Sequence, residues 1–369
     1  MTKDPEGRSA FRRDRVRGLL IAAAVIAFGL CEAPRMQAAR DTLDIYFVDV
    51  EGGQATLVAT PAGETLLVDT GFPGSGSGFD ATPGDPARAR DAQRILAAAR
   101  DAGVTRIDYL LITHFHADHD GGVVELAQVL PIRTFVDHGR VLPVAEETSR
   151  GTLAAFDRYA AVRAKGQHLE PAPGDRIPLK GVEATVLSGA GVTVKTPLPG
   201  AGGRTVGCAA ASPAQEPHEN PRSTGVRLQF GSFRFLDLGD LTGPPLHALA
   251  CPENMVGAVD VYLVAHHGGL DAADPATFAA FRPRVSIVNN GPMKGGAPEL
   301  FRTLHTSPNA GDVYQLHTSQ IAGAENFADE RIANLDTSSA HWLKVSARAD
   351  GSFTVTNART GAATRYAPR

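Results

Sequence analysis

Histidine and aspartate side chains follow directly on an apolar run in the segment YLLITHFHADHDGG, residues 109–122. His114 and His116 alternate in sequence, so in an extended chain they face the same side. Asp118 and His119 come next, where the glycines end the strand. Unpaired polar groups beside a core are costly, and imidazole and carboxylate are ligands of zinc. The segment predicts a metal site, because the alternative, an exposed histidine-rich turn, does not explain the apolar strand before it.

Strands and helices in mixed order must position this segment. Apolar, β-branched runs predict strands at residues 43–50, 54–60, 65–71, 107–113, 133–137, 182–187, 225–230, 233–237, 259–265 and 285–288. Apolar periodicity and caps predict helices near residues 86–103, 122–129, 153–164, 275–281 and 298–305. The tail alternates about Asp350–Gly351, which indicates a closing hairpin within a C-terminal extension from about residue 291. Strands interspersed with helices favour an α/β fold with sheets inside helical layers.

The first 39 residues have the pattern of a secretory signal peptide. One lysine and five arginines precede a run of twelve mainly apolar residues, 19–30, and small residues follow near Ala39. A membrane anchor is the alternative, but it needs about 20 apolar residues. We therefore expect cleavage near Ala39 and a mature domain of residues 40–369, without a transmembrane segment, that is periplasmic or secreted.

Export changes the charge and the cysteine count. The leader holds seven basic and four acidic side chains, so its removal moves the formal net charge from −4 to −7. An acidic chain does not favour nucleic acid as a partner. Cys208 and Cys251 are the two cysteines that remain. In an oxidising compartment they favour one disulfide, with two buried free thiols as the alternative.

The run HFHADH resembles the HxHxDH signature of the metallo-β-lactamase superfamily. Three further runs resemble its other motifs in order: LLVDTG with Asp69, FRFLDLGDL with Asp240, and VYLVAHHGG with His266. The resemblance implies a four-layer αββα sandwich with two divalent metal ions. Zinc is favoured, and manganese or iron are alternatives because they occupy similar nitrogen and oxygen sites.

The same resemblance implies a ligand set and a reaction. One metal is expected on His114 and His116, the other on Asp118, His119 and His266, with Asp240 between them. A metal-activated water would be the nucleophile, and His116, Asp118 and Asp240 are expected to be catalytic. Asp69 is expected to orient the cluster. His267 would face away from His266 in an extended chain, so a supporting role is expected for it.

One departure from the superfamily concerns a further histidine that many members carry in a GHT-like turn. This sequence lacks that turn, and the histidines that could replace it are His138, His168 and His218. For His138 a metal ligand, a substrate contact and a structural hydrogen bond all stay open. Asn220 is a candidate for a substrate loop. Lys294 and His317 could contact an anionic substrate, or they could be solvated surface.

The motif HHGG, with STGVRLQFGSFRFLDLGD before it, most resembles the hydrolase domain of the bacterial DNA-uptake protein ComEC and its stand-alone relatives. That branch implies phosphodiester hydrolysis, with a small or lipid-derived ester preferred over DNA because of the chain's charge. Lactones, β-lactams and other esters are the alternative substrates. A metal-binding module of an envelope complex without catalytic activity is the alternative of another class.

Overall fold

Two β-sheets form the centre of the chain in the computed structural model, which describes residues 41–76, 81–209, 212–214 and 217–369. The predicted signal peptide and its cleavage site lie outside these residues. Contacts divide the chain into two compact units, 1–36 and 37–369, and every described residue belongs to the second. Among the described residues, no helix combines the length and the apolar character that crossing a membrane requires.

The first sheet has nine strands in the order β19-β18-β17-β1-β2-β3-β4-β5-β6. Strand β1, near the start of the described chain, pairs antiparallel with β17, near its end. The strands β3, β4 and β5 run parallel. The bounds are β1 Leu43–Phe47, β2 Thr56–Ala59, β3 Thr65–Val68, β4 Ile107–Leu111, β5 Ile132–Val136, β6 Gln167–Leu169, β17 Leu343–Ala347, β18 Phe353–Asn357 and β19 Ala363–Tyr366.

The second sheet has eight strands in the order β16-β15-β14-β13-β12-β11-β8-β7. Its strands from β12 to β16 are parallel. The bounds are β7 Arg176–Ile177, β8 Glu183–Val186, β11 Val226–Phe230, β12 Phe233–Asp237, β13 Val261–Leu263, β14 Val285–Val288, β15 Asp312–His317 and β16 Ile332–Asn334. A separate short pair joins β9 Ser188–Gly189 to β10 Val192–Thr193.

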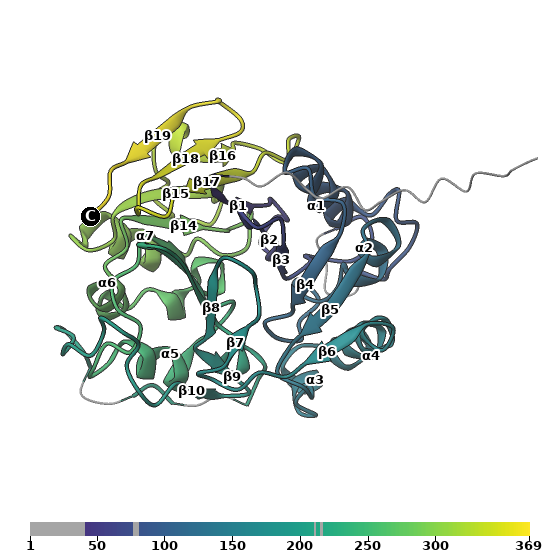
Figure 1. Cartoon of the computed structure of the whole chain (residues 1–369), viewed down its shortest axis with the longest axis horizontal. Coiled ribbons are helices and arrows are strands. Elements are labelled where there is room, and N and C mark those ends of the chain that lie inside the picture. Colours follow the sequence, from purple (N-terminus) through teal and green to yellow (C-terminus); the bar gives the residue numbers. More distant parts are fainter. Residues whose placement is uncertain (1–40, 77–80, 210–211, 215–216) are drawn as a thin grey trace, which may run out of the picture. The chain divides into compact units, whose positions relative to one another are not determined.

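Helices lie outside both sheets (Figure 1). Next to the nine-stranded sheet are α1 Arg90–Asp101, α2 Val123–Val129, α3 Ala145–Thr148 and α4 Thr152–Arg163, and next to the other sheet are α5 Gly243–Ala250, α6 Pro275–Phe281 and α7 Pro298–Thr306. Short 3₁₀ turns are η1 Asn220–Arg222, η2 His266–Gly268, η3 Leu270–Ala272 and η4 Asp329–Arg331.

Alternation along the strands builds three apolar layers from these elements. Phe47 and Phe235 meet edge to face across the two sheets, with ring centroids 5.7 Å apart. Their neighbours in sequence point the other way: Tyr46 packs in the cluster beneath α1, and Leu236 in the cluster beneath α5 and α6. Each buried aromatic ring contributes about 1.5–3 kcal/mol of apolar transfer free energy. A core between the sheets and one on each outer face make a four-layer sandwich, so the expected αββα fold is confirmed.

The strand and helix predictions agree closely with the structure. β12, β14 and α6 have the predicted bounds, and the predicted hairpin about Asp350–Gly351 joins β17 to β18. The residues after 291 complete both sheets, since β15 and β16 extend one and β17 to β19 extend the other. Several elements were not predicted: the helices α3 and α5, and the strands β6, β7, β9, β10, β15, β16 and β19.

Cys208 and Cys251 form a disulfide, as the sequence predicted. The bond joins the loop before the β11–β12 hairpin to the end of α5, across a sequence separation of 43 residues. Cys251 is buried against the apolar cluster that also holds Leu249 and Met255. The bond therefore fixes a long loop to the helical layer outside the eight-stranded sheet.

Replacing both cysteines by serine should lower the free energy of unfolding by about 4 kcal/mol, because a closed loop of this length restricts the unfolded chain. Urea unfolding of the chain from Arg40 onward, compared with the double variant, measures this difference. Thiol titration of the denatured, unreduced parent gives an independent check. Two reactive thiols per chain would contradict the bond.

Candidate metal centre

The candidate site lies where the carboxyl ends of parallel strands from both sheets meet. Asp69 follows β3 and His114 follows β4, while Asp240 follows β12 and His266 follows β13. Carboxyl ends of parallel strands lie at one edge of a sheet, where α/β proteins place their ligands. Gln54 ties the two edges together, because its Nε2 donates to both carboxylate oxygens of Asp237 at 3.0 and 3.2 Å.

The loop from His114 to Gly122 is folded tightly against its neighbours. The backbone N–H groups of His119 and Asp120 both donate to the carbonyl oxygen of His116. A Cβ at Gly121 would lie 2.1 Å from Ala117 O, and one at Gly122 would lie 2.3 Å from Thr70 O. Only glycine fits such close backbone approaches. The glycines of the motif therefore turn the loop so that its polar side chains point inward.

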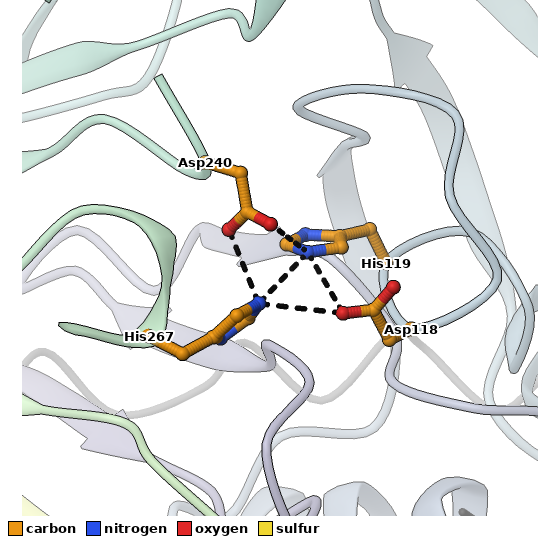
Figure 2. Close-up of side chains that lie close together, drawn as sticks. All are labelled: Asp118, His119, Asp240 and His267. Carbon is orange, nitrogen blue, oxygen red and sulfur yellow. Dashed lines mark hydrogen bonds and ion pairs between the residues drawn. The ribbon is translucent and has the colours of Figure 1, made fainter. Parts of the chain in front are cut away.

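Four side chains from three loops converge on one point (Figure 2). Asp118, His119, Asp240 and His267 each offer one donor atom, and these atoms all lie within 4.8 Å of one another. His119 Nε2 lies 3.3 Å from Asp118 Oδ2 and 3.2 Å from Asp240 Oδ2. His267 Nε2 lies 3.3 Å from Asp118 Oδ2 and 3.2 Å from Asp240 Oδ1. We call these four residues the cluster.

The pKa values of the two carboxylates in the cluster favour the binding of a cation. Burial alone would raise the pKa of Asp118, but Lys294 and His119 hold that pKa well below its usual range. Burial would also raise the pKa of Asp240, and His119, His267 and His266 likewise hold it well below. Two ionised carboxylates are therefore buried side by side, which is unfavourable unless positive charge lies between them.

Asp69 orients His119 from behind. The His119 Nδ1–H donates to Asp69 Oδ2 at 2.7 Å, since a carboxylate only accepts. Thr113 holds the same carboxylate through its backbone N–H and its hydroxyl, each at 2.8 Å. His119 Nε2 therefore faces the cluster. Burial would lower the pKa of this ring, but Asp240 and Asp118 raise it well above its usual value, so a metal bound here would displace the Nε2 proton. The contact between Asp69 and His119 is the orienting one that the sequence led us to expect.

His114 and His116 lie beside the cluster with their rings close together. His114 Nε2 and His116 Nδ1 are 2.9 Å apart, and His114 Nε2 is 3.8 Å from Asp240 Oδ2. Burial lowers the pKa of His114 well below its usual value and that of His116 to about 4, so both rings are neutral. Neutral imidazole is the form that binds metals.

The residues present fit a divalent metal. Asp240 Oδ1 is buried and makes no hydrogen bond among the described residues, although it lies 3.2 Å from His267 Nε2, and His116 Nε2 is likewise buried without a hydrogen-bond partner. Buried polar atoms are normally satisfied, so orphans of this kind indicate a missing partner. Imidazole nitrogens with carboxylate oxygens are a donor set for zinc, manganese or iron.

The last histidine pair differs from the expectation drawn from an extended chain. His266 and His267 have φ angles of +51° and +53°, so the backbone is left-handed at both. This turn directs His267 into the cluster, in the position expected for His266. His266 lies at the rim, with its Nε2 3.7 Å from Asp240 Oδ2. Alternation of side chains holds only for extended residues, and these two are not extended.

Two of the three histidines considered as replacements for the absent turn have carboxylate partners away from the cluster, whereas His218 lines the cleft and its Nδ1 accepts from the backbone N–H of Asn220 at 3.3 Å. His138 is buried, and its Nε2 lies 3.0 Å from Glu219 Oε2. His168 Nε2 lies 2.9 Å from Asp137 Oδ1. The contact of His138 corresponds to the structural hydrogen bond that the sequence left open.

Asn220 and Lys294 reach the site, whereas His317 does not. Asn220 Nδ2 lies 3.1 Å from His266 Nε2, and Lys294 Nζ contacts Asp118 Oδ2. His317 is buried at the end of β15, with its Nε2 3.0 Å from Asp49 Oδ1. It therefore lies neither at the surface nor in the cleft described next.

A cleft of about 600 Å³ opens over these residues. Its lining consists of metal-ligand candidates, hydroxyl groups and cations: His116, Asp118, Thr148, Ser149, Arg150, His218, Asn220, Asp240, His266 and Lys294. Sequence reasoning missed Arg150 and Asp271, the carboxylate that contacts His266 Nδ1 at 2.8 Å. Asp271 lies five residues after His266, so a search for carboxylates near each candidate ligand could have found it.

Comparison with protein families identifies the fold. The model of the metallo-β-lactamase superfamily matches residues 48–269, more than half of the chain. The chain belongs to this superfamily. Its members carry out more than one chemistry, so membership leaves the reaction open. A comparison with curated protein sequences gives no significant match.

Three solved structures illustrate the similarity. The metallo-β-lactamase fold protein YhfI from Bacillus subtilis is 12% identical, with 75% of this chain and 96% of that chain covered and a TM-score of 0.43. CmlA, a diiron β-hydroxylase from Streptomyces venezuelae, is 15% identical (76% and 53% covered, TM-score 0.40). MEM-A1, a subclass B3 metallo-β-lactamase from a soil metagenome library, is 14% identical (66% and 89% covered, TM-score 0.37).

Asp240 contacts more of the candidate ligands than any other carboxylate described here, so its loss should have the largest effect on metal content. The Asp240→Ala variant should bind less than half of the zinc of the parent, because both Oδ1 and Oδ2 lie among the imidazoles. Elemental analysis after dialysis measures this loss. The exposed Glu299→Gln variant is the control and should keep the parent's zinc. Unchanged zinc in Asp240→Ala would show that these residues are not the ligands.

Proposed function

We propose that this chain is an exported metal-dependent hydrolase that acts on a small anionic ester, with a phosphodiester as the preferred substrate. The observation that carries the proposal is the arrangement of the cleft. Ionised, buried carboxylates form its floor beside the neutral ring of His116, and the cations Lys294 and Arg150 are in its lining. A metal held by that floor would supply Lewis acidity and acidify water, which is the chemistry of ester hydrolysis.

The side chains of the lining suit an anionic substrate. Lys294 approaches the cluster from the loop after β14, and Arg150 lies between α3 and α4. Cations in two different loops can hold an anion through charge-assisted hydrogen bonds. The amide of Asn220, also in the lining, can orient a substrate oxygen. A phosphodiester meets these features, since it keeps one negative charge at neutral pH.

The size of the cleft and the charge of the chain support a small substrate. A volume of about 600 Å³ lies in the range of small-molecule sites, which is roughly 300–1,000 Å³. The formal net charge of −4, or −7 without the predicted leader, opposes long nucleic acid. Similarity to the ComEC-like branch is part of the proposal and rests on the HHGG motif. The disulfide supports export, because such bonds persist in oxidising compartments.

A panel of chromogenic substrates tests the reaction. With zinc or manganese, the chain should hydrolyse bis(p-nitrophenyl) phosphate faster than p-nitrophenyl phosphate, a lactone or a β-lactam. The Arg150→Ala variant should raise KM for the diester roughly tenfold, through loss of one charge-assisted contact. The control Arg302→Ala removes an exposed arginine of α7 and should leave KM unchanged.

Each other outcome of the panel has a definite meaning. Turnover of a lactone or β-lactam with an untouched diester would replace the phosphodiester by that ester class. Full metal loading without turnover of any substrate would favour a binding module without catalytic activity.

A further inference from the structure

A fully buried carboxylate, Glu219, lies beside the cleft but outside the candidate metal centre. It directly precedes Asn220, the first residue of η1. Burial would raise the pKa of Glu219, but hydrogen bonds from His138 and from the backbone N–H of Leu142 hold that pKa below its usual value. The group is therefore ionised in the interior, which is unfavourable unless donors surround it.

The donors that face Glu219 come from the segment between β5 and α4, residues 138–151, which we call the strap. His138 Nε2–H donates to Glu219 Oε2 at 3.0 Å, and the backbone N–H of Leu142 donates to Oε1 at 2.6 Å. Arg222 of η1 adds a third link, since its Nη2 donates to the carbonyl oxygen of Arg140 at 3.2 Å. The strap follows a strand of the first sheet, whereas η1 leads into β11 of the second. Glu219 therefore joins segments that belong to different sheets.

Hydrogen bonds along the strap connect Leu142 to the residues that line the cleft. The backbone N–H of Ala145 donates to Leu142 O at 2.9 Å, and that of Ser149 donates to Ala145 O at 2.8 Å. The end of α3 then places Thr148, Ser149 and Arg150 in the lining of the cleft. The position of Leu142 therefore determines where these hydroxyl groups and this guanidinium lie.

On the other side of Glu219, Asn220 also lines the cleft. Its side chain is almost fully buried, and its Nδ2 lies 3.1 Å from His266 Nε2. Its Oδ1 is buried and makes no hydrogen bond among the described residues. Buried acceptors are normally satisfied, so Asn220 can accept a hydrogen bond from a molecule bound in the cleft.

We propose that Glu219 is a positioning residue for substrate binding, because its carboxylate joins the strap to η1 and so holds Arg150 and Asn220 against the same bound ester. Arg150 and Asn220 contact the substrate, and Glu219 acts through them. This inference rests on the proposed function, which assigns an anionic ester to the cleft.

The donors around Glu219 explain why a carboxylate is needed at this position. Glutamine has one acceptor atom and one donor group, so it would direct an N–H at either His138 or Leu142. A shift of the His138 proton to Nδ1 would not relieve this, because Nδ1 lies 3.5 Å from Arg222 Nη2, which is itself a donor. The Glu219→Gln variant therefore breaks the link with almost no change in side-chain volume.

Steady-state kinetics of the zinc-loaded full chain tests the proposal, with the ester that the substrate panel shows to be hydrolysed fastest. Glu219→Gln should raise KM roughly tenfold, while kcat and zinc content change less than about twofold. Arg150→Ala should raise KM roughly tenfold in the parent but less than about twofold in the Glu219→Gln background, because both changes remove the same contact. His138→Asn, whose shorter side chain does not reach Glu219, should reproduce the effect of Glu219→Gln.

The control is Asp260→Asn, which alters a buried carboxylate far from the cleft. Asp260 accepts from the backbone N–H of Arg234 at 2.9 Å and precedes β13, at the opposite end of that strand from His266. This variant should leave KM unchanged and keep the full effect of Arg150→Ala. Thermal unfolding verifies that every variant is folded.

Hydrogen exchange of the backbone amides tests the link without a substrate. In Glu219→Gln, exchange should become faster in residues 138–151 and 219–222 and stay at the parental rate in the strands of both sheets. Faster exchange confined to these segments would keep the link even if no ester in the panel were hydrolysed, in which case only the proposed function would be rejected.

Three results would overturn the proposal: a parental KM in Glu219→Gln, a full tenfold effect of Arg150→Ala in that background, or unchanged exchange in the strap. Faster exchange throughout the chain would also overturn it, because Glu219 would then stabilise the fold as a whole. Each of these results can occur with normal turnover of the diester by the parent, so the proposed function would stand.

Discussion

The burial of two ionised carboxylates beside each other is the constraint on which the site depends. Asp118 and Asp240 lie within reach of the same two imidazoles and are almost fully buried. Their mutual repulsion in a low-dielectric interior must be offset by positive charge. In the structure, Lys294 and the imidazoles supply that charge. A divalent cation supplies more of it at the same point, and the donor atoms already face inward.

The apolar layers of the four-layer architecture stabilise the strands that carry these two carboxylates. Each sheet has large apolar clusters on both faces, so the strands are held without help from the site. The loops at the carboxyl ends of β3, β4, β12 and β13 can then carry polar side chains. Glycines at the closest approaches, such as Gly121, Gly122 and Gly239, let these loops touch. A Cβ at Gly239 would lie 2.7 Å from Thr113 Cβ, so the β12 loop packs directly on the histidine loop of β4.

Local patterns predicted most of the fold and the centre of the site. β12, β14 and α6 were predicted within their bounds because their apolar runs have clear turn or proline signals at the ends. The motif HFHADH and Asp240 were found because residue type and spacing there specify chemistry. The prediction that His267 faces away from the metal ligands was wrong, because nothing in the sequence indicates left-handed backbone at two histidines. His317 was expected at the surface or against a substrate, and this was wrong because β15, which ends with it, was not recognised as a strand. Arg150 reaches the cleft through the way distant loops fold together, which no local pattern encodes. Asp271, by contrast, lies five residues after His266 and was missed only because carboxylates near that ligand were not considered.

The most direct test of the account is anomalous diffraction at the zinc edge from crystals of the zinc-loaded protein. We expect an anomalous peak within bonding distance of Asp118, His119, Asp240 and His267, about 2.0–2.2 Å from each donor atom. We also expect that the Lys294 amine no longer contacts Asp118. No peak at this position in zinc-loaded crystals, with Lys294 still paired to Asp118, would contradict the central claim that these buried residues are a metal site.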